Sequence, residues 1–209
     1  MTRNITVNAQ SSIRIAAGKV IYFDPFKITG AANDADIIFI THEHFDHFSP
    51  DDIAKVASDK TVFAAPASME KAILASGISP DKLVTLDPGV KTEVCGIPVE
   101  TVPAYNPGKK FHPKSNNWLG YIVTLEGQRI YVAGDTDVTP EAKAVSCDIA
   151  MIPIGGTFTM DFREAAGFIS ELKPKTVIPT HYGSVVGDPS DGESFAKLVE
   201  GSTEVVFKL

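Results

Sequence analysis

The sequence predicts a mixed α/β protein in which helices cover mixed β-sheets. Short apolar runs alternate with turn residues and amphipathic stretches along the whole chain, and the apolar run at 37–40 is typical of a strand buried on both faces. The chain has 209 residues, 44% of them hydrophobic and 22% charged, which suffices for a sizeable core. Because no linker or low-complexity tract divides it, residues 1–209 are expected to form a single domain.

The elements of the first half follow from apolar periodicity and turn residues. The first three strands are expected to form a meander broken at Ala17-Gly18. A helix is expected from Ser49, because Ser49 is a suitable N-cap, Pro50 occupies the first helical position and Asp52 has a capping-box-like spacing. A second helix covers 67–76 and ends at Gly77. The expected strands are 5–7, 13–15, 20–23, 36–40, 61–65, 84–86, 92–95 and 99–102.

The second half repeats this plan. Residues 119–125 and 129–133 are expected to form a hairpin across Glu126-Gly127-Gln128. A helix is expected to begin near Thr139, and Asp161 should cap another over 162–172, with Glu164 three residues later. The remaining expectations are strands at 149–152, 177–178 and 204–207 and a helix at 194–199.

Bulk composition excludes some classes of partner. A formal net charge of −7 disfavours nucleic acid as an electrostatic partner. No apolar run approaches the roughly 18 residues that a membrane span needs, and no secretory signal is recognised, so a cytoplasmic location is expected. The two cysteines, Cys95 and Cys147, lie in unrelated contexts and are expected to be buried free thiols. The oligomeric state is left open.

The most informative segment is Thr41-His42-Glu43-His44-Phe45-Asp46-His47. It follows the apolar run at 37–40 and holds three of the five histidines of the chain together with an enclosed carboxylate. Imidazole and carboxylate are the nitrogen and oxygen ligands that zinc and similar divalent metals take. The segment therefore predicts a metal site.

Two further candidate ligands lie just past predicted strands. Asp135 in Gly134-Asp135-Thr136 follows the strand at 129–133, and His181 in Thr180-His181 follows the strand at 177–178. Loops at the carboxyl ends of strands are where ligand groups converge in α/β sheets. The glycines of Gly155-Gly156 are expected to let the backbone pass close to the same site.

The order His-x-His-x-Asp-His, then Gly-Asp-Thr, then Thr-His closely resembles the metallo-β-lactamase superfamily of metal-dependent hydrolases. The resemblance covers nearly the whole chain and is greatest to small, stand-alone members, which include ascorbate-phosphate lactonase-like and phospholipase-D-like proteins. It implies a four-layer αβ/βα sandwich, with two sheets face to face, helices outside and the site at one sheet edge. Asp24 in Phe23-Asp24-Pro25 resembles the strand-end carboxylate that supports the His-rich loop.

The resemblance also implies a set of ligands. His42 and His44 would hold a first metal with a third ligand from mid-chain, Asp46, His47 and His181 would hold a second, and Asp135 would bridge the two. Relatives often carry a histidine where this chain has Asn106, and His112 lies six residues later. We expect His112 to be the shifted ligand, with Asn106 or water as the alternative. Zn²⁺ is the expected ion, with Mn²⁺ and Fe²⁺ as alternatives.

Four residues are candidates for the substrate side of the site. Gln10 stands where similar members often carry a histidine, and Asn106 occupies the mid-chain position. Lys109 and Lys114 belong to a basic loop in an otherwise acidic protein, so they could attract an anionic substrate, although a solvated loop explains them as well.

The expected function is hydrolysis of an ester-type bond in a small molecule: a lactone, a phosphodiester or a related substrate. Two divalent ions would share a bridging hydroxide, because coordination lowers the pKa of water towards about 7. Asp46 and Asp135 are the expected catalytic carboxylates, with Asp46 orienting the hydroxide and taking its proton. An iron-dependent oxidoreductase on the same scaffold and a non-catalytic metal-binding protein are the alternatives.

Overall fold

The computed structural model describes all 209 residues, and its strands form two sheets. The first sheet has the order β1-β2-β3-β4-β5-β6, and the second has the order β13-β12-β11-β10-β9-β8-β7. The strands of the first sheet are β1 (Ile5–Ala9), β2 (Ser12–Ala17), β3 (Lys19–Phe23), β4 (Ile37–Phe39), β5 (Val62–Pro66) and β6 (Leu83–Leu86). Those of the second are β7 (Lys91–Val94), β8 (Ile97–Pro103), β9 (Leu119–Leu125), β10 (Gln128–Val132), β11 (Ile149–Pro153), β12 (Thr176–Thr180) and β13 (Glu204–Val205).

Each sheet combines antiparallel and parallel pairing. In the first, β1, β2 and β3 are antiparallel neighbours, and β3 to β6 pair in parallel. In the second, β7 to β10 are antiparallel, and β10 to β13 pair in parallel. The predicted mixed sheets are therefore confirmed, and the second half of the chain does repeat the plan of the first.

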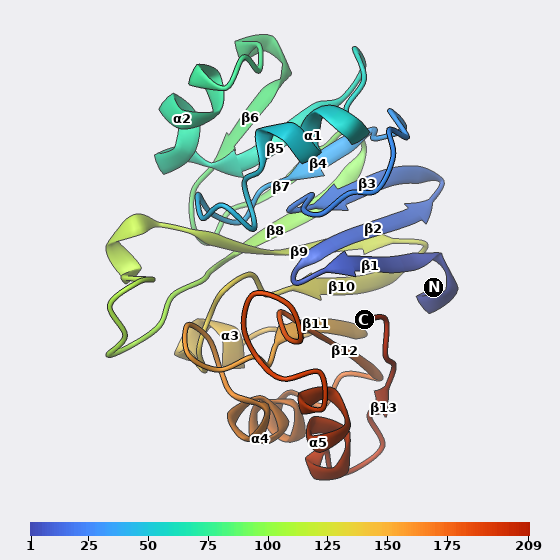
Figure 1. Cartoon of the computed structure of the whole chain (residues 1–209), viewed down its shortest axis with the longest axis vertical. Helices are drawn as coiled ribbons and strands as arrows, with labels where there is room; N and C mark the ends of the chain where they lie inside the picture. The colour runs from blue at the N-terminus through green and yellow to red at the C-terminus, as the bar shows by residue number, and fades with distance from the viewer.

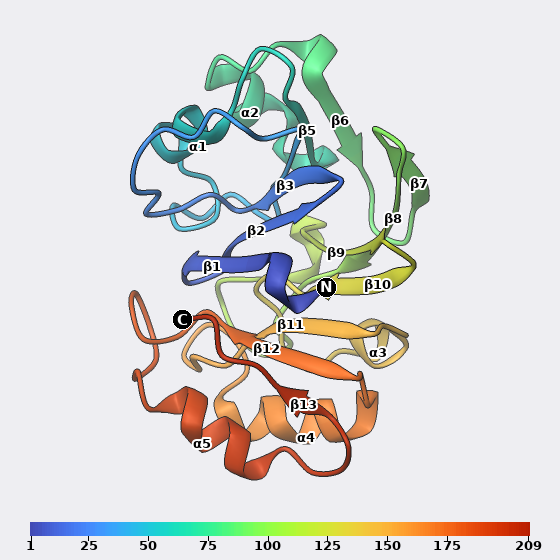
Figure 2. The same ribbon diagram turned by 90° about the vertical axis from the view of Figure 1, so that its right-hand side faces the viewer.

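Helices lie outside the two sheets. Figure 2 shows four layers, with α1 and α2 over the first sheet and α3, α4 and α5 over the second, so the predicted αβ/βα sandwich is confirmed. The helices are α1 (Pro50–Val56), α2 (Glu70–Ala75), α3 (Pro140–Lys143), α4 (Phe162–Leu172) and α5 (Asp191–Leu198). Short 3₁₀ turns occupy Thr2–Asn4, Ala67–Met69, Pro80–Lys82 and Lys114–Asn116. No helix is long and apolar enough to cross a bilayer.

Three apolar clusters hold these layers together. The largest contains 23 buried residues and lies between the sheets, where Phe23, Phe39 and Tyr121 contact one another. A second cluster of 16 residues joins the second sheet to its helices, and a third of 10 joins the first sheet to α1 and α2. Every residue of β4, β11 and β12 is buried, as expected for parallel strands covered on both faces.

Both predicted N-cap residues, Ser49 and Asp161, stand at the start of their helices, but only Asp161 forms the expected capping bonds. The Asp161 side chain accepts from the backbone of Arg163 and Glu164, and the Glu164 carboxylate accepts from the Asp161 N–H, which completes a capping box at α4. Ser49 makes no such bond at α1, because its hydroxyl donates to Asp52. The Asp52 carboxylate instead accepts the backbone N–H groups of Lys27 and Ile28. Tertiary contacts have thus replaced the expected local cap.

The expectation of two buried thiols was also wrong in part. Both cysteines are free, but Cys95 is exposed and Cys147 is only half-buried. Cys95 lies with a φ of 50° in the turn before Gly96 that joins β7 to β8, and this turn faces solvent. Neither cysteine belongs to a candidate metal group.

Candidate metal centre

Loops from both sheets converge at one edge of the sandwich. The His-rich loop follows β4 of the first sheet, whereas Asp135 and His181 follow β10 and β12 of the second. His112 belongs to the excursion between β8 and β9, residues 104–118, which extends on the left of Figure 1. The carboxyl ends of these strands therefore bring together side chains that are up to 139 positions apart, from His42 to His181.

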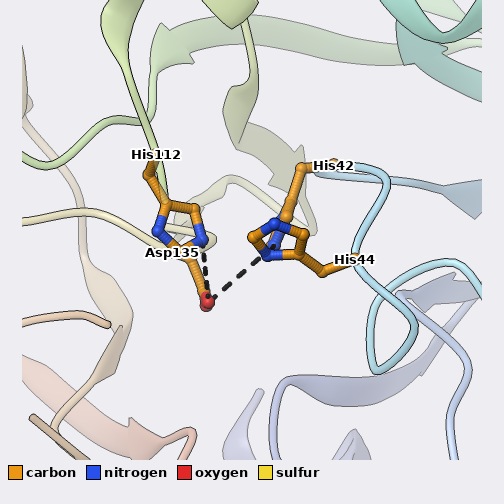
Figure 3. Close-up of side chains that lie close together, drawn as sticks. All are labelled: His42, His44, His112 and Asp135. Carbon is orange, nitrogen blue, oxygen red and sulfur yellow. Dashed lines mark hydrogen bonds and ion pairs between the residues drawn. The ribbon is translucent and has the colours of Figure 1, made fainter. Parts of the chain in front are cut away.

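One group of candidate ligands consists of His42, His44, His112 and Asp135. Figure 3 shows the imidazoles of His112 and His42 directed at the Asp135 carboxylate, with His44 alongside. The Asp135 Oδ2 atom lies 3.4 Å from His112 Nε2 and 3.8 Å from His42 Nε2. His42 Nε2 lies 3.1 Å from His44 Nδ1. His112 thus takes part in the group, as expected from the sequence.

A second group consists of Asp46, His47 and His181. The Asp46 Oδ2 atom lies 3.3 Å from His181 Nε2 and 3.7 Å from His47 Nε2. Asp135 reaches this group as well, since its Oδ1 is 3.3 Å from His47 Nε2 and its Oδ2 is 3.2 Å from His181 Nε2. The Asp135 carboxylate therefore lies between the two groups.

The two groups fit divalent metal ions. Metal bonds of about 2.0–2.1 Å in tetrahedral geometry place neighbouring ligand atoms roughly 3.3 Å apart, close to the spacings found in both groups. Several of the candidate ligand atoms are buried without any hydrogen-bond partner. Burying an unpaired polar atom destabilises a protein unless another group, such as a metal ion, binds it. These atoms are His47 Nε2, both ring nitrogens of His112 and His181, and Asp135 Oδ1.

The His-rich loop is held from behind by Asp24. This fully buried carboxylate lies 2.7 Å from His47 Nδ1 and accepts from the backbone N–H and the hydroxyl of Thr41, at 2.8 and 2.6 Å. The contact fixes the ring of His47 and directs Nε2 towards Asp135. The support that the resemblance implied for Asp24 is therefore present in the structure.

The single tryptophan supports the other group. The Trp118 ring is buried against His42, His44 and His112, with ring centroids 4.9, 5.0 and 5.4 Å away. Its neighbour Leu119 donates its N–H to the Thr41 carbonyl, and Tyr121 donates its hydroxyl to the Ile40 carbonyl. These bonds tie β9 of the second sheet to the start of the His-rich loop.

The backbone around His181 is unusual. His181 has a φ of 56°, in the left-handed region, and its N–H donates to the carbonyl of Gln10, itself at a φ of 49°. A Cβ at Gly155 would lie 2.1 Å from the His181 carbonyl oxygen, so only glycine fits there. The close passage predicted for Gly155-Gly156 is present, and non-glycine residues in strained conformations gather at functional sites.

The pKa shifts of His42, His44 and Asp135 suit metal binding, whereas that of His47 does not. Burial and then the neighbouring His47 lower the pKa of His42 well below its ordinary value, and burial and His112 lower that of His44. Burial alone would raise the pKa of Asp135, but His181 and His47 outweigh it and hold that pKa well below the usual range. Neutral imidazoles and ionised carboxylates are the forms that bind metals. Although burial opposes it, Asp135 and Asp24 raise the pKa of His47 well above its ordinary value, so a metal would have to displace a proton there.

A cavity of about 200 Å³ opens directly over the ligands. His44, Asp46, His112, Asp135 and His181 form its inner end, and its remaining walls are Phe45, Phe111, Phe158 and Val185. Sequence reasoning did not identify these four apolar residues. The available signal was their position, since Phe45 lies inside the His-rich segment and Phe111 directly precedes His112.

None of the four candidate substrate residues lines this cavity. Lys109 pairs with Asp137 at 2.7 Å and donates to the Thr159 carbonyl, and Lys114 pairs with Glu141 above the Tyr105 ring. Both ammonium groups therefore serve loop structure. Gln10 and Asn106 are buried, and their backbones bond to those of His181 and His112, while the amide atoms of both side chains lack hydrogen-bond partners.

Comparison with known proteins agrees with this geometry. Residues 4–181 match the model of the β-lactamase superfamily domain. A UPF0173 metal-dependent hydrolase of Pyrococcus abyssi is 36% identical over 207 residues, covering 92% of this chain and 90% of the relative.

Solved structures give the same assignment. A protein from Parabacteroides distasonis, assigned as a metal-dependent hydrolase, superposes with a TM-score of 0.81 at 32% identity, covering 98% of this chain and 92% of its own. Igni18, a metallo hydrolase from Ignicoccus hospitalis, has the same fold, with a TM-score of 0.79 at 21% identity and coverage of 97% and 93%. The chain therefore belongs to the β-lactamase superfamily and, within it, to the UPF0173 metal-dependent hydrolases.

Proposed function

We propose that this metal-dependent hydrolase binds two divalent ions and cleaves an ester-type bond in a small molecule. His42, His44 and His112 would hold one ion, and Asp46, His47 and His181 the other. The position of Asp135 carries the proposal, because its carboxylate lies within 3.2–3.8 Å of nitrogen atoms from both groups and can serve both ions.

When bound, the ions would supply a water activated at neutral pH and a Lewis acid for the oxygen of the reacting group. Asp46 lines the cavity, so its carboxylate is placed to accept a proton from that water. Although burial opposes it, the neighbouring His181 lowers the pKa of Asp46, so this carboxylate is ionised and able to accept a proton at neutral pH. The proton can then pass to the leaving alcohol.

The donor set favours Zn²⁺ and accepts Mn²⁺ or Fe²⁺. All seven residues offer nitrogen or oxygen atoms and none is a cysteine, so the softest ions are disfavoured. The buried, tightly spaced histidines are ligands that suit zinc.

Metal analysis combined with hydrolysis assays tests the proposal. Protein purified without chelators should contain about two ions per chain. It should hydrolyse at least one of three substrate classes: 4-nitrophenyl esters, bis(4-nitrophenyl) phosphate and simple lactones. Asp135→Asn should lower the metal content and reduce hydrolysis by more than the roughly 10- to 100-fold that outer partners of metal ligands cost. Asp87→Asn, at an exposed turn, is the matched control.

The assay has outcomes that contradict the proposal. One ion per chain or fewer would refute a dinuclear site, and full hydrolysis by an Asp46→Asn variant would refute the role of Asp46. Iron in the purified protein together with oxygen consumption would point to an oxidoreductase on this scaffold instead.

A further inference from the structure

The cavity over the metal groups has an apolar outer part. Phe45 comes from the His-rich loop, Phe111 from the excursion between β8 and β9, Phe158 from the loop after β11 and Val185 from the loop after β12. Phe111 and Phe158 meet edge to face, with ring centroids 5.2 Å apart, and Phe45 meets Phe26 in the same manner at 5.9 Å. Four separate loops thus contribute to one apolar wall.

This wall is exposed to solvent at an energetic cost. The chain exposes six large hydrophobic side chains, and three of them, Phe45, Phe111 and Val185, line the mouth of this cavity. Phe45 is 66% exposed and Phe111 is 53% exposed, although both lie beside the candidate ligands. Exposed apolar groups that gather at a site mark contact with an apolar ligand.

No lysine or arginine lines the cavity. Lys109 pairs with Asp137 and Lys114 pairs with Glu141. Lys27 donates to the hydroxyl of Ser184, next to Val185, but is not part of the cavity wall. Lys110 is exposed beside Phe111 but is not part of the cavity wall. A charged group on the far side of the reacting bond would therefore rest on phenylalanine rings, which cannot replace its hydration.

The size of the cavity limits what it can hold. Its volume of about 200 Å³ lies below the roughly 300–1,000 Å³ of sites for drug-sized ligands. An apolar cavity of roughly 150 Å³ is enough for one benzene molecule. The bound group is therefore of the size of a phenyl ring or a short acyl chain.

We propose that the substrate is an uncharged carboxylic ester, open-chain or cyclic, whose small apolar acyl or aryl group lies against Phe45, Phe111, Phe158 and Val185. This inference rests on the hydrolase function proposed above. It assigns specificity to the apolar wall and removes Lys109 and Lys114 from substrate recognition.

Two 4-nitrophenyl esters of matched length test the assignment in the metal-loaded protein. The butyrate ends in a methyl group, whereas the hemisuccinate carries a carboxylate at the same position. The butyrate should be the better substrate in kcat/KM by at least about tenfold, since the wall offers no partner for the carboxylate. From acetate to butyrate, kcat/KM should rise by up to about fourfold for each added methylene.

Variants of the wall should change this preference. Phe111→Ala should reduce kcat/KM for the butyrate while leaving the acetate nearly unchanged, and Phe111→Lys should bring the hemisuccinate level with the butyrate or above it. Phe207→Ala removes a phenylalanine that is 46% exposed elsewhere and should have no effect. Lys110→Ala should leave the ratio of the two esters unchanged.

A binding measurement separates failure of this inference from failure of the hydrolase function. Butyranilide and N-phenylsuccinamic acid differ in the same way as the two esters and are not readily cleaved, so their affinities for the metal-loaded protein can be compared by calorimetry. Butyranilide should bind at least about tenfold more tightly.

Equal affinities, or a preference for the acid, would overturn the apolar assignment even if esters are hydrolysed. So would hydrolysis restricted to 4-nitrophenyl phosphate or bis(4-nitrophenyl) phosphate. Tight binding of butyranilide without any ester hydrolysis would instead refute the proposed function and leave the apolar specificity of the wall intact.

Discussion

Asp24 influences the metal groups without being one of their ligands. It is completely buried and its carboxylate makes three close contacts, with His47 and twice with Thr41. Burial raises the pKa of Asp24, whereas His47 opposes that rise. A carboxylate kept in such a position acts by fixing the orientation of a ligand, and its removal should therefore alter metal affinity before it alters the fold.

Asp24→Asn tests this role. Asparagine keeps the shape of the side chain and tolerates the φ of 46° at this position, but it weakens the bond that holds His47. We expect metal affinity to fall by about 10- to 100-fold, as for other partners of metal ligands. Competition with a chromophoric chelator measures the change. Asp34→Asn, which loses surface contacts with Tyr22 and Arg14, should leave the affinity unaltered. Equal affinities for wild type and Asp24→Asn would rule the role out.

The metal ligands could be predicted from the sequence, whereas the apolar residues around them could not. All seven candidate ligands come together, including His112, which had to be chosen against Asn106. The residue types predicted a metal site, and the family resemblance supplied the full set of ligands. The apolar wall carried no such signal, because a phenylalanine in a loop is equally consistent with a small satellite core.

At the scale of elements, Gly155 positions the loop that carries His181. It follows β11, and any Cβ there would overlap the His181 carbonyl oxygen at 2.1 Å. The loop after β12 would have to move away, and with it a ligand of the second group. The same loop is already held in a left-handed conformation at His181, so it has little freedom to adjust.

Gly155→Ala should therefore reduce both metal content and stability, with a destabilisation of about 1–3 kcal/mol typical of overpacking. Gly167→Ala is the matched control, because no atom lies within 4 Å of its Cβ position in α4. That control should be stabilised by up to about 1 kcal/mol, since alanine favours helices over glycine. Urea unfolding and metal analysis measure both variants. A stable, fully loaded Gly155→Ala protein would contradict this account.

Asp52 performs a second positioning task, at the start of α1. Its carboxylate accepts from the backbone of Lys27 and Ile28 and pairs with Lys55 at 2.7 Å, so it anchors the segment between β3 and β4 to the helix. Although burial opposes it, the bond from Lys55 lowers the pKa of Asp52. The ionised form is thus favoured by folding, and its contribution to stability is present above the unfolded pKa of about 3.9 and lost below it.

Asp52→Asn should lower the free energy of unfolding by about 1–3 kcal/mol at neutral pH, because the backbone N–H groups of Lys27 and Ile28 lose a charged acceptor. The difference from wild type should stay constant above about pH 5 and shrink as the pH falls below about 4, because the unfolded wild-type chain then binds a proton that the folded chain takes up only at lower pH. Denaturant unfolding between pH 3 and 7 measures this. Asp51→Asn, at the exposed neighbouring position, should show little change at any pH. A pH-independent difference would refute the role of the charge.

Asp52 also shows why some elements were predicted incompletely. The spacing of Ser49 and Asp52 favoured a local capping box, but backbone N–H groups 24 and 25 positions earlier compete for the same carboxylate. Such long-range competition leaves no trace in a short sequence window. At Asp161 no distant donor competes, so the predicted cap forms.

At the scale of the whole molecule, the alternation of strands and helices predicted the mixed sheets, and the order of motifs predicted their arrangement as a sandwich. The prediction that the two sheets pack face to face required the family resemblance. It depends on contacts such as those of Phe23 and Phe39 with Tyr121, which are 82 or more residues apart in the chain. Periodicity reports which face of a strand is buried, but it does not report which other strand covers that face.

The arrangement of ligands implies that metal stabilises the entire sandwich. His42, His44, Asp46 and His47 follow a strand of the first sheet, whereas His112, Asp135 and His181 belong to the second. Bound ions would therefore link the two sheets at one edge, and such a constellation does not exist in the unfolded chain. Any ligand that binds only the folded state stabilises it by mass action.

Removal of metal should accordingly lower the melting temperature of the whole protein. An ion present at 100 times its Kd contributes about 2.7 kcal/mol. In a chain of this size 1 kcal/mol corresponds to about 2–4 °C, so chelation should lower Tm by about 5–11 °C for each site emptied. Scanning calorimetry with and without a chelator measures the shift, and added Zn²⁺ should restore it. His42→Ala should respond less to the chelator than wild type, because one site is already impaired. The same chelator shift in wild type and in His42→Ala, or no shift in either, would show that the two sheets hold together without help from the metal.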